Sequence, residues 1–315
     1  MPRRKTSQVR KKKHERKLHL KVSSPRIVGF ECLRLLKKST RILIVLGLLS
    51  AAGWGAKSGM RKFFIENEEF RLKEVKLETN GELTEEQFVE LSGIDLTATL
   101  FAIKLREIRE RMLVRSGIVR VELSRRLPGT LRVKIMERVP IAWLECRPLG
   151  IVGRDPASGL LLDEGGVCFP CEDWMGEKAR TLPVVLVSQA KEGDVTIGKQ
   201  LRHHEAKRAL ELIKLSQSKL MGADWTLPVV AVRNDYSLEA AVSSGALAIF
   251  GMYDHERQLE NLGTLLRETE GLAEPMAVVN LIPERNIPVT AGRAGATGFE
   301  PETRLQRDIK AILKQ

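Results

Sequence analysis

The sequence predicts an α+β protein: a single transmembrane helix, then a β-α-α-β-β unit, then a mixed, β-rich domain with two longer helices. Three observations predict this class. A basic arm leads into one long apolar run, which is typical of a membrane segment with retained flanking charge. Short segments of alternating apolar residues, separated by Gly, Pro and Asn turns, are typical of strands. Two later segments space their apolar residues as helices do.

The apolar run ILIVLGLLSAAGWGA covers 42–56 and lies between Arg41 and Lys57. A helix of this length is about 22 Å long, whereas the hydrocarbon core of a bilayer is about 30 Å thick. The long flanking cations can reach the headgroups, so we predict an uncleaved span over 41–60. The side chains expected to lie in the membrane are Ile42, Leu43, Ile44, Val45, Leu46, Leu48, Leu49 and Trp54.

The charge distribution predicts the orientation of that span. Residues 1–41 carry 15 Lys and Arg against Glu15 and Glu31, a net charge of +13, while the rest of the chain is nearly neutral. Cationic segments beside a span stay in the cytoplasm, so the folded bulk is expected on the extracytoplasmic side. Cleavage after Ala51 or Ala52 is the less favoured alternative, since a secretory signal would begin near the first residue.

The basic tail is expected to be disordered and to contact the anionic headgroups of the lipid bilayer. Specific nucleic-acid binding is the less favoured interpretation, because the blocks RRK and RKKKHERK contain no Phe, Tyr or Trp on which bases could stack.

The first segment after the span is predicted to fold as the β-α-α-β-β unit. Residues 70–79, FRLKEVKLET, alternate as a strand does and end at an Asn-Gly turn. Thr84 and Gln87 then form the capping box of a short helix. A second helix is predicted over 103–114, followed by the strands IVRVEL and TLRVKIME, which a Pro-Gly turn joins.

The stretch SRRLPGTLRVKIMERVPIAWL, 124–144, completes this unit. Together with the basic tail, the single span and the helix pair, it resembles the POTRA domain of the bacterial cell-division family FtsQ, called DivIB in Gram-positive bacteria. The shared features are basic residues, a Pro, a small-residue turn, Thr-Leu, an alternating strand, Glu-Arg, Pro and an apolar-Trp pair. LLLDEGGVCFP and MAVVNLIPERNIPVTAG are similar to hairpins of the family's second domain, so the resemblance covers about 26–292.

The resemblance implies five regions: a basic cytoplasmic tail at 1–40, a transmembrane helix at 41–60, a POTRA domain at 67–140, an FtsQ-like β domain at 141–292 and a C-terminal tail at 293–315. Helices of the β domain are predicted over about 199–221 and 254–269. The last residues, RLQRDIKAILKQ, have helical spacing and are expected to form a frayed helix, with a second partner contact as the alternative.

The resemblance also implies a function in binding. Members of the family are non-enzymatic, bitopic scaffolds of the divisome, enriched at the septum of the inner membrane, that recruit or regulate septal cell-wall synthesis. Their terminal strands receive the complex of FtsB and FtsL, two small bitopic division proteins, and other divisome membrane proteins are implied partners. An exposed sheet edge suits such binding because its N–H and C=O groups can pair with a partner strand.

Mapped onto this chain, the partner-binding residues are Val278, Val279, Leu281, Ile287, Val289 and Thr290. The inward-facing half of this set is expected to be ordinary core. Pro283 and Pro288 interrupt the two strands, so the docking surface is expected to be short.

Three fragments imitate catalytic motifs. Residues 193–200 fit G-x-x-x-x-G-K but have Gln where a magnesium-binding Ser or Thr belongs. Residues 216–219 match S-x-x-K without the SDN or KTG partners of penicillin-binding proteins. On a helix, His203 and His204 would point about 100° apart and would not share a metal with Glu205. We therefore expect no catalytic residue, no metal and no cofactor.

Two other function classes stay open beside the division scaffold. One is a different POTRA-bearing protein of envelope assembly or translocation, although such proteins usually carry a barrel or several POTRA units. The weaker one is a cell-wall enzyme, for which the sequence offers no nucleophile with a base.

The cysteines predict a disulfide. Cys168 and Cys171 form a C-x-x-C that follows a Gly-Gly turn, unlike a thioredoxin-type pair, which opens a helix. In an oxidising compartment, either these two bond to each other or Cys146 bonds to one of them. Cys32 precedes the span and is expected to stay reduced or to be acylated.

Overall fold

The computed structural model describes residues 39–40, 42–55, 59, 63, 67–219, 224–269, 276–292 and 303–314. The chain divides into two compact units, Met1–Glu66 and Asn67–Gln315. Most of the predicted basic tail and the thiol of Cys32 lie outside the described residues.

In the first unit, residues 42–55 are helical. The apolar side chains along them are exposed: Ile42, Leu43, Ile44, Val45, Leu46, Leu48, Leu49 and Trp54. The single transmembrane helix of the predicted fold class is nevertheless wrong, because no helix in the described part of the chain is both long enough and apolar enough to cross a membrane. The supported class is α+β, with a POTRA-like region and a large mixed sheet.

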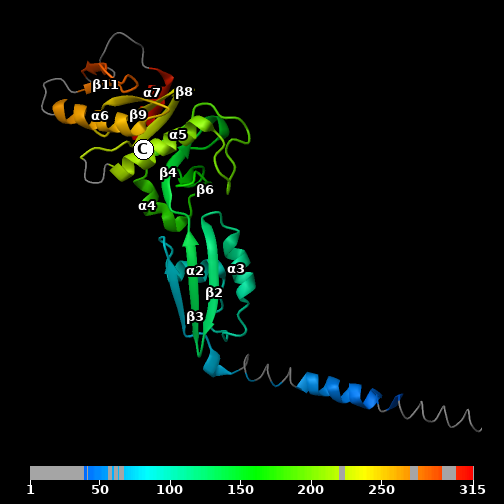
Figure 1. Cartoon of the computed structure of the whole chain (residues 1–315). Coiled ribbons are helices and arrows are strands. Elements are labelled where there is room, and N and C mark those ends of the chain that lie inside the picture. The colour runs from blue at the N-terminus through cyan, green and yellow to red at the C-terminus, as the bar shows by residue number, and fades with distance from the viewer. Residues whose placement is uncertain are drawn as a thin grey trace, which may run out of the picture. The chain divides into compact units, whose positions relative to one another are not determined.

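The POTRA-like region begins the second unit (Figure 1). Its elements are the 3-10 helix η1 (Glu68–Phe70), β1 (Glu74–Thr79), α2 (Glu85–Ser92), α3 (Leu105–Leu113), β2 (Ile118–Arg126) and β3 (Thr130–Glu137). The predicted β-α-α-β-β order is therefore correct. The sheet order is β1-β3-β2, with β1 parallel and β2 antiparallel to β3.

The helix-capping residues of this region act as the sequence predicts. The capping box of α2 is present: the Thr84 hydroxyl accepts from the Gln87 N–H, and the Gln87 side chain accepts from the Thr84 N–H. Gly93 ends α2 with φ +62°, a left-handed conformation that glycine adopts without strain. Phe88 and Met112 from the two helices belong to the same apolar core as Val133 of the sheet, and all three are fully buried.

The β domain is built on one nine-stranded sheet of order β12-β11-β10-β9-β8-β7-β4-β5-β6. Its strands are β4 (Pro140–Glu145), β5 (Leu160–Asp163), β6 (Cys168–Pro170), β7 (Val184–Leu186), β8 (Val229–Asn234), β9 (Ser237–Ala241), β10 (Leu247–Gly251), β11 (Met276–Asn280) and β12 (Val289–Ala291). β4, β7 and β8 run parallel to one another, as do β10 and β11, and the other neighbours are antiparallel.

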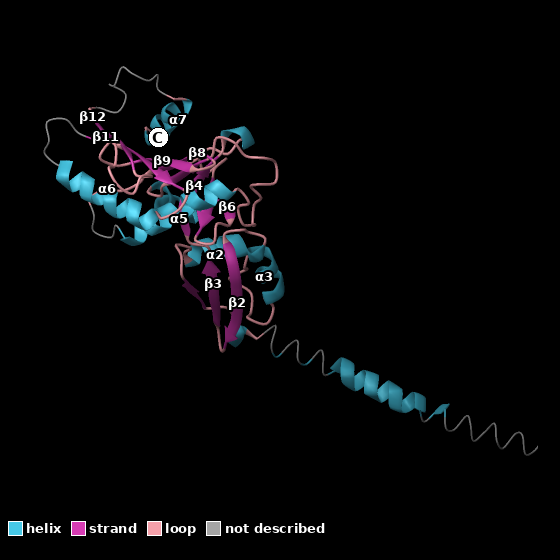
Figure 2. Ribbon diagram, turned by 45° about the horizontal axis from the view of Figure 1, so that its top comes forward, coloured by secondary structure: helices cyan, strands magenta, loops and turns pink. Residues whose placement is uncertain are grey.

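Helices cover both faces of this sheet (Figure 2). They are the 3-10 helices η2 (Arg147–Leu149) and η3 (Asp173–Met175) and the α-helices α4 (Gly176–Arg180), α5 (His204–Lys219), α6 (His255–Thr269) and α7 (Arg304–Leu313). Buried residues of α5 and α6 share one apolar cluster with one face of the sheet, while α4 and α7 contribute to the cluster on the other face. The sheet is thus the middle layer of the domain.

Two helices differ from their predictions. The helix predicted from 199 begins at His204, because residues 198–200 are hydrogen-bonded to β6 instead and the ring of His203 accepts from the Ala206 N–H at 3.3 Å. The C-terminal helix expected to fray is docked: Ile309 and Ile312 of α7 are buried against the sheet.

Candidate functional site

The strand β12 forms one edge of the nine-stranded sheet, and its outer side pairs with no strand in the described part of the chain. Its inner side pairs antiparallel with β11, through Val279 with Val289 and Val278 with Thr290. The last inner hydrogen bond runs from the Asn280 N–H to the Pro288 carbonyl, at 3.0 Å. The three residues of β12 are exposed. This edge can accept a further strand.

The six residues predicted to bind a partner divide into two groups. Val279 and Leu281 are fully buried, so they belong to the core on which the edge rests. Val278 and Ile287 are half-buried, whereas Val289 and Thr290 are exposed on the edge strand itself. The structure therefore brings all six together, but only the second group offers surface to a partner.

The opposite edge of the sheet is covered. The N–H of Cys168 on β6 donates to the Lys199 carbonyl at 3.0 Å, and the Gly198 N–H donates to the Cys168 carbonyl at 2.7 Å. Val167 and Gln200 form a further bridge. Covering an edge prevents unwanted strand pairing, so the two edges of this sheet differ in their capacity to bind.

The turn before β12 is held from two sides. The Asn280 side chain accepts from the Ile282 N–H at 3.1 Å, and Arg257 of α6 donates to the Pro283 carbonyl at 3.4 Å. Asn286 takes a left-handed conformation, φ +53°, which asparagine tolerates better than most residues. These contacts anchor β12 to α6 and present it as a defined edge.

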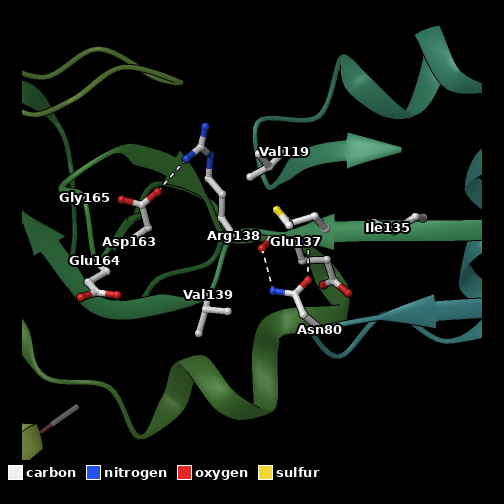
Figure 3. A pocket seen from close by; sticks show the side chains of 10 residues that line it. Asn80, Val119, Ile135, Glu137, Arg138, Val139, Asp163, Glu164 and Gly165 are labelled. Atoms are coloured by element: carbon white, nitrogen blue, oxygen red, sulfur yellow. Dashed lines mark hydrogen bonds and ion pairs between the residues drawn. The ribbon is translucent and has the colours of Figure 1, made fainter. Parts of the chain in front are cut away.

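A second site, which the sequence analysis did not identify, joins the POTRA-like region to the β domain (Figure 3). The carboxylate of Glu137, at the end of β3, is buried and accepts from the Thr79 hydroxyl, from the Leu83 N–H at 3.2 Å and from the Trp174 indole N–H at 2.8 Å. The Asn80 side chain accepts from the Glu137 N–H at 2.7 Å and donates to its carbonyl at 3.2 Å.

Charged pairs strengthen the same junction. Arg138 donates to Asp163 of β5 at 2.6 Å and to the Ser116 carbonyl at 2.9 Å, as Figure 3 shows for the first pair. Arg115 donates to Glu172 at 2.7 Å, with its guanidinium 5.8 Å from the ring of Trp174. The Arg138–Asp163 pair lines a hollow of about 370 Å³. The sequence signal for this site was the Glu-Arg pair in 124–144, which is Glu137 and Arg138. Their hydrogen-bond partners could be identified only from the structure.

The three described cysteines carry free thiols. Burial raises the pKa of Cys168 to about 12, and burial also raises the pKa of Cys146 and Cys171. Thiols with raised pKa values stay protonated at neutral pH and react slowly. The disulfide among them stays a prediction.

Residues in the fragments that resemble catalytic motifs make structural contacts. The hydroxyl of Ser216 is buried and donates to the Ile213 carbonyl at 2.7 Å, while Lys219 pairs with two glutamates of α6. His203 caps α5, and its other ring nitrogen lies 2.7 Å from the Gln189 carbonyl. No group of three metal-ligating side chains occurs among the described residues.

Comparisons with known proteins agree on one relationship. Residues 70–138 match the family model described as "POTRA domain, FtsQ-type". The chain is 24% identical over 252 residues to the cell division protein FtsQ of Geotalea daltonii, an alignment that covers 78% of this chain and 85% of that protein. It is 36% identical over 73 residues to the FtsQ proteins of Rickettsia felis and Rickettsia conorii, where the alignment covers 23% of this chain and only 27% of those proteins.

Proposed function

The chain belongs to the FtsQ/DivIB family of bacterial cell-division proteins, and from this premise we propose that it is a non-enzymatic divisome scaffold. Its β12 edge binds small division proteins of the FtsB and FtsL type, and through them it recruits or regulates septal cell-wall synthesis. One observation carries this proposal: the outer side of β12 has no neighbouring strand in the described part of the chain, in a sheet whose other edge is covered.

The partner contributes one strand to the sheet. Each backbone hydrogen bond to β12 adds about 0.5–1.5 kcal/mol net, and selectivity comes from side chains that alternate between the faces. Val289 lies beside Val279 in one row of the sheet, and Thr290 lies beside Val278 in the next row. Because β12 has only three residues and follows Pro288, the ladder is short, and affinity needs further contacts beside the strand.

The proposed location is the division site at the cell inner membrane, with the folded part on the extracytoplasmic side. The names of the relatives support the division-site role. The net charge of +13 in residues 1–41 supports contact with anionic headgroups, and the orientation is the one that the FtsQ/DivIB resemblance implies. A fluorescent fusion to the full chain should mark midcell in dividing cells, and an even distribution would contradict this location.

The binding proposal is tested by Val289→Lys. A lysine on an exposed edge strand is one of the devices by which proteins prevent strand addition. Capture of the purified extracytoplasmic parts of the partner pair should weaken roughly tenfold or more. The matched control is Val119→Lys, since Val119 is 45% exposed and Val289 is 41% exposed, on strands of different sheets. Undiminished capture by folded Val289→Lys protein, or equal loss in the control, would move the site elsewhere.

A further inference from the structure

The turn that follows β1 contains the dipeptide Asn80-Gly81, a sequence with a strong tendency to deamidate. The tendency comes from the glycine, whose backbone nitrogen has no adjacent side chain to hinder its attack on the asparagine amide. The sequence contains six asparagines, and Asn80 is the one followed by glycine. The turn lies at the junction of the POTRA-like region with the β domain, where the side chain of Asn80 meets Glu137 (Figure 3).

Deamidation at this dipeptide needs no reactant other than water. The backbone nitrogen of Gly81 attacks Cγ of Asn80 and closes a five-membered succinimide ring. The Cγ–Nδ2 bond breaks, and the amide group leaves as ammonia with the proton of the attacking nitrogen. Water then adds its oxygen to one of the two ring carbonyl carbons and returns a proton to the nitrogen. The product is aspartate or isoaspartate, and either one carries a negative charge where the amide was neutral.

The fold depends on both residues of the dipeptide. A Cβ at position 81 would overlap the carboxylate of Glu137, which is held in place by three donors, so only glycine fits there. The Asn80 side chain accepts from the Glu137 N–H at 2.7 Å and donates to the Glu137 carbonyl at 3.2 Å. An amide can do both, whereas an ionised aspartate can only accept. The junction is therefore built on a pair of residues that is chemically labile.

The native contacts engage both reacting groups. The Gly81 N–H donates to the Thr79 hydroxyl at 3.2 Å, so the proton that must leave the nitrogen is held. The amide of Asn80 is held by its two hydrogen bonds to the backbone of Glu137, which break when Cγ turns toward the nitrogen. The reaction therefore proceeds from molecules in which the turn has opened locally.

Water has access to the turn. The side chain of Asn80 is exposed and lines the hollow of about 370 Å³ at the junction. Once the ring has closed, its hydrolysis is not limited by burial. The opening of the turn is thus the step that the fold controls.

We propose that Asn80 is a deamidation site whose conversion loosens the junction between the POTRA-like region and the β domain. The product has no N–H to donate to the Glu137 carbonyl. Its charge has the same sign as that of the buried Glu137 carboxylate, so the two groups repel each other. Isoaspartate also adds a methylene group to the backbone after β1. Because conversion accumulates with time, the junction of old molecules is looser than that of newly made ones.

The first test measures the rate of conversion in the full chain, which is kept folded at neutral pH and followed by peptide mass spectrometry. A synthetic peptide of residues 77–84, LETNGELT, is the unprotected reference. Asn80 should convert roughly tenfold more slowly in the folded chain than in the peptide, and faster than the other asparagines of the chain.

Thr79→Val tests the contribution of the hydroxyl, because it frees the Gly81 N–H and keeps the shape of the side chain. It should raise the rate of conversion in the folded chain roughly threefold or more. The matched control is Thr79→Ser, which keeps a hydroxyl and should convert at the parent rate. Peptides with the same substitutions should convert alike, so that a difference between the folded proteins comes from the fold.

The second test measures the consequence on Asn80→Asp, which is one product of the reaction. Hydrogen exchange in 79–84 and 137–139 should speed up roughly tenfold, since the turn and the end of β3 lose a shared contact. The matched control is Asn234→Asp. Asn234 accepts from the Tyr236 N–H at 3.2 Å and from the Ser237 hydroxyl at 2.7 Å, and aspartate keeps both contacts. Exchange around position 234 should change by no more than about twofold.

Three results would overturn the proposal. The first is conversion of Asn80 as fast in the folded parent as in the peptide, and the second is an intact amide after the time in which a tenfold slower reaction would be complete. The third is parent-like exchange at the junction in folded Asn80→Asp. Should Thr79→Val not fold, the comparison of parent with peptide decides the first point. Should Asn80→Asp not fold, the deamidated fraction of aged parent, separated by anion exchange, takes its place.

Discussion

The indole N–H of Trp174 donates to the buried carboxylate of Glu137 at 2.8 Å and thereby ties the β domain to the last strand of the POTRA-like region. The same carboxylate accepts from the Thr79 hydroxyl and the Leu83 N–H. One acidic side chain thus satisfies donors from three parts of the chain, and each donor would be unpaired and poorly hydrated without it.

We therefore expect Glu137→Ala to lower the free energy of unfolding by about 2–4 kcal/mol, because two buried donors and one part-buried donor lose their acceptor. Urea unfolding followed by Trp fluorescence measures this. The control is Glu122→Ala, at an exposed position on β2 whose contact is an exposed ion pair, and it should cost less than about 0.5 kcal/mol. A difference of under about 0.5 kcal/mol between the two variants would show that the junction does not depend on Glu137.

Glu145 should make stability depend on pH. Burial raises the pKa of this carboxyl above its ordinary value, although its contact with Arg147 opposes the shift. The native state therefore holds the proton more tightly than the unfolded state does, so this group contributes stability at low pH that is lost as the pH rises through the raised pKa. Because Gln has no ionisable side chain, Glu145→Gln lacks this contribution to the pH dependence of stability.

The measurement is the unfolding free energy of the parent and of Glu145→Gln between pH 4 and pH 7. The free energy of unfolding of Glu145→Gln should increase relative to that of the parent as the pH rises. That of Glu110→Gln, at an exposed position of α3, should change with pH as that of the parent does. A gap between parent and Glu145→Gln that stays constant over this range, or that closes, would contradict the raised pKa.

The three thiols should differ in their rates of alkylation. Because Cys146 and Cys168 are buried and the pKa of Cys168 is raised to about 12, both should stay unmodified by iodoacetamide at pH 8 while the protein is folded. Cys171 is half-buried and should react first. Peptide mass spectrometry reads the order, with denatured protein as the control in which all three react. Rapid labelling of Cys168 in folded protein would contradict its burial.

The docking of α7 rests on two buried side chains, Ile309 and Ile312. Ile312→Ala should cost about 2–4 kcal/mol of local stability, since it leaves a cavity beneath α7. Hydrogen exchange should then speed up in 304–313 and stay unchanged in α5 and α6. Leu313→Ala, at an exposed position of the same helix, is the control. Unchanged exchange in α7 would mean that other contacts hold it.

Much of the fold follows from short-range patterns. Thr84 with Gln87, the alternation of 130–137 and the hairpin in 160–170 each specify a local structure within a few residues, and the structure contains all three. The same reasoning failed for 41–60, where an apolar run and flanking charge predicted a transmembrane helix. In the described part of the chain no helix is both long enough and apolar enough to cross a membrane.

The candidate site was predictable only in part. The sequence by itself determined the strands and most of the helices, and it indicated the terminal hairpin as the site to examine. The tertiary structure alone decided that β12 lies at one edge while 198–200 covers the other, that Glu137 meets Trp174, and that α7 docks on the sheet. The physical reason is range: turns, caps and alternation act between near neighbours, whereas edges, buried carboxylates and clefts arise where residues far apart in the chain share one space.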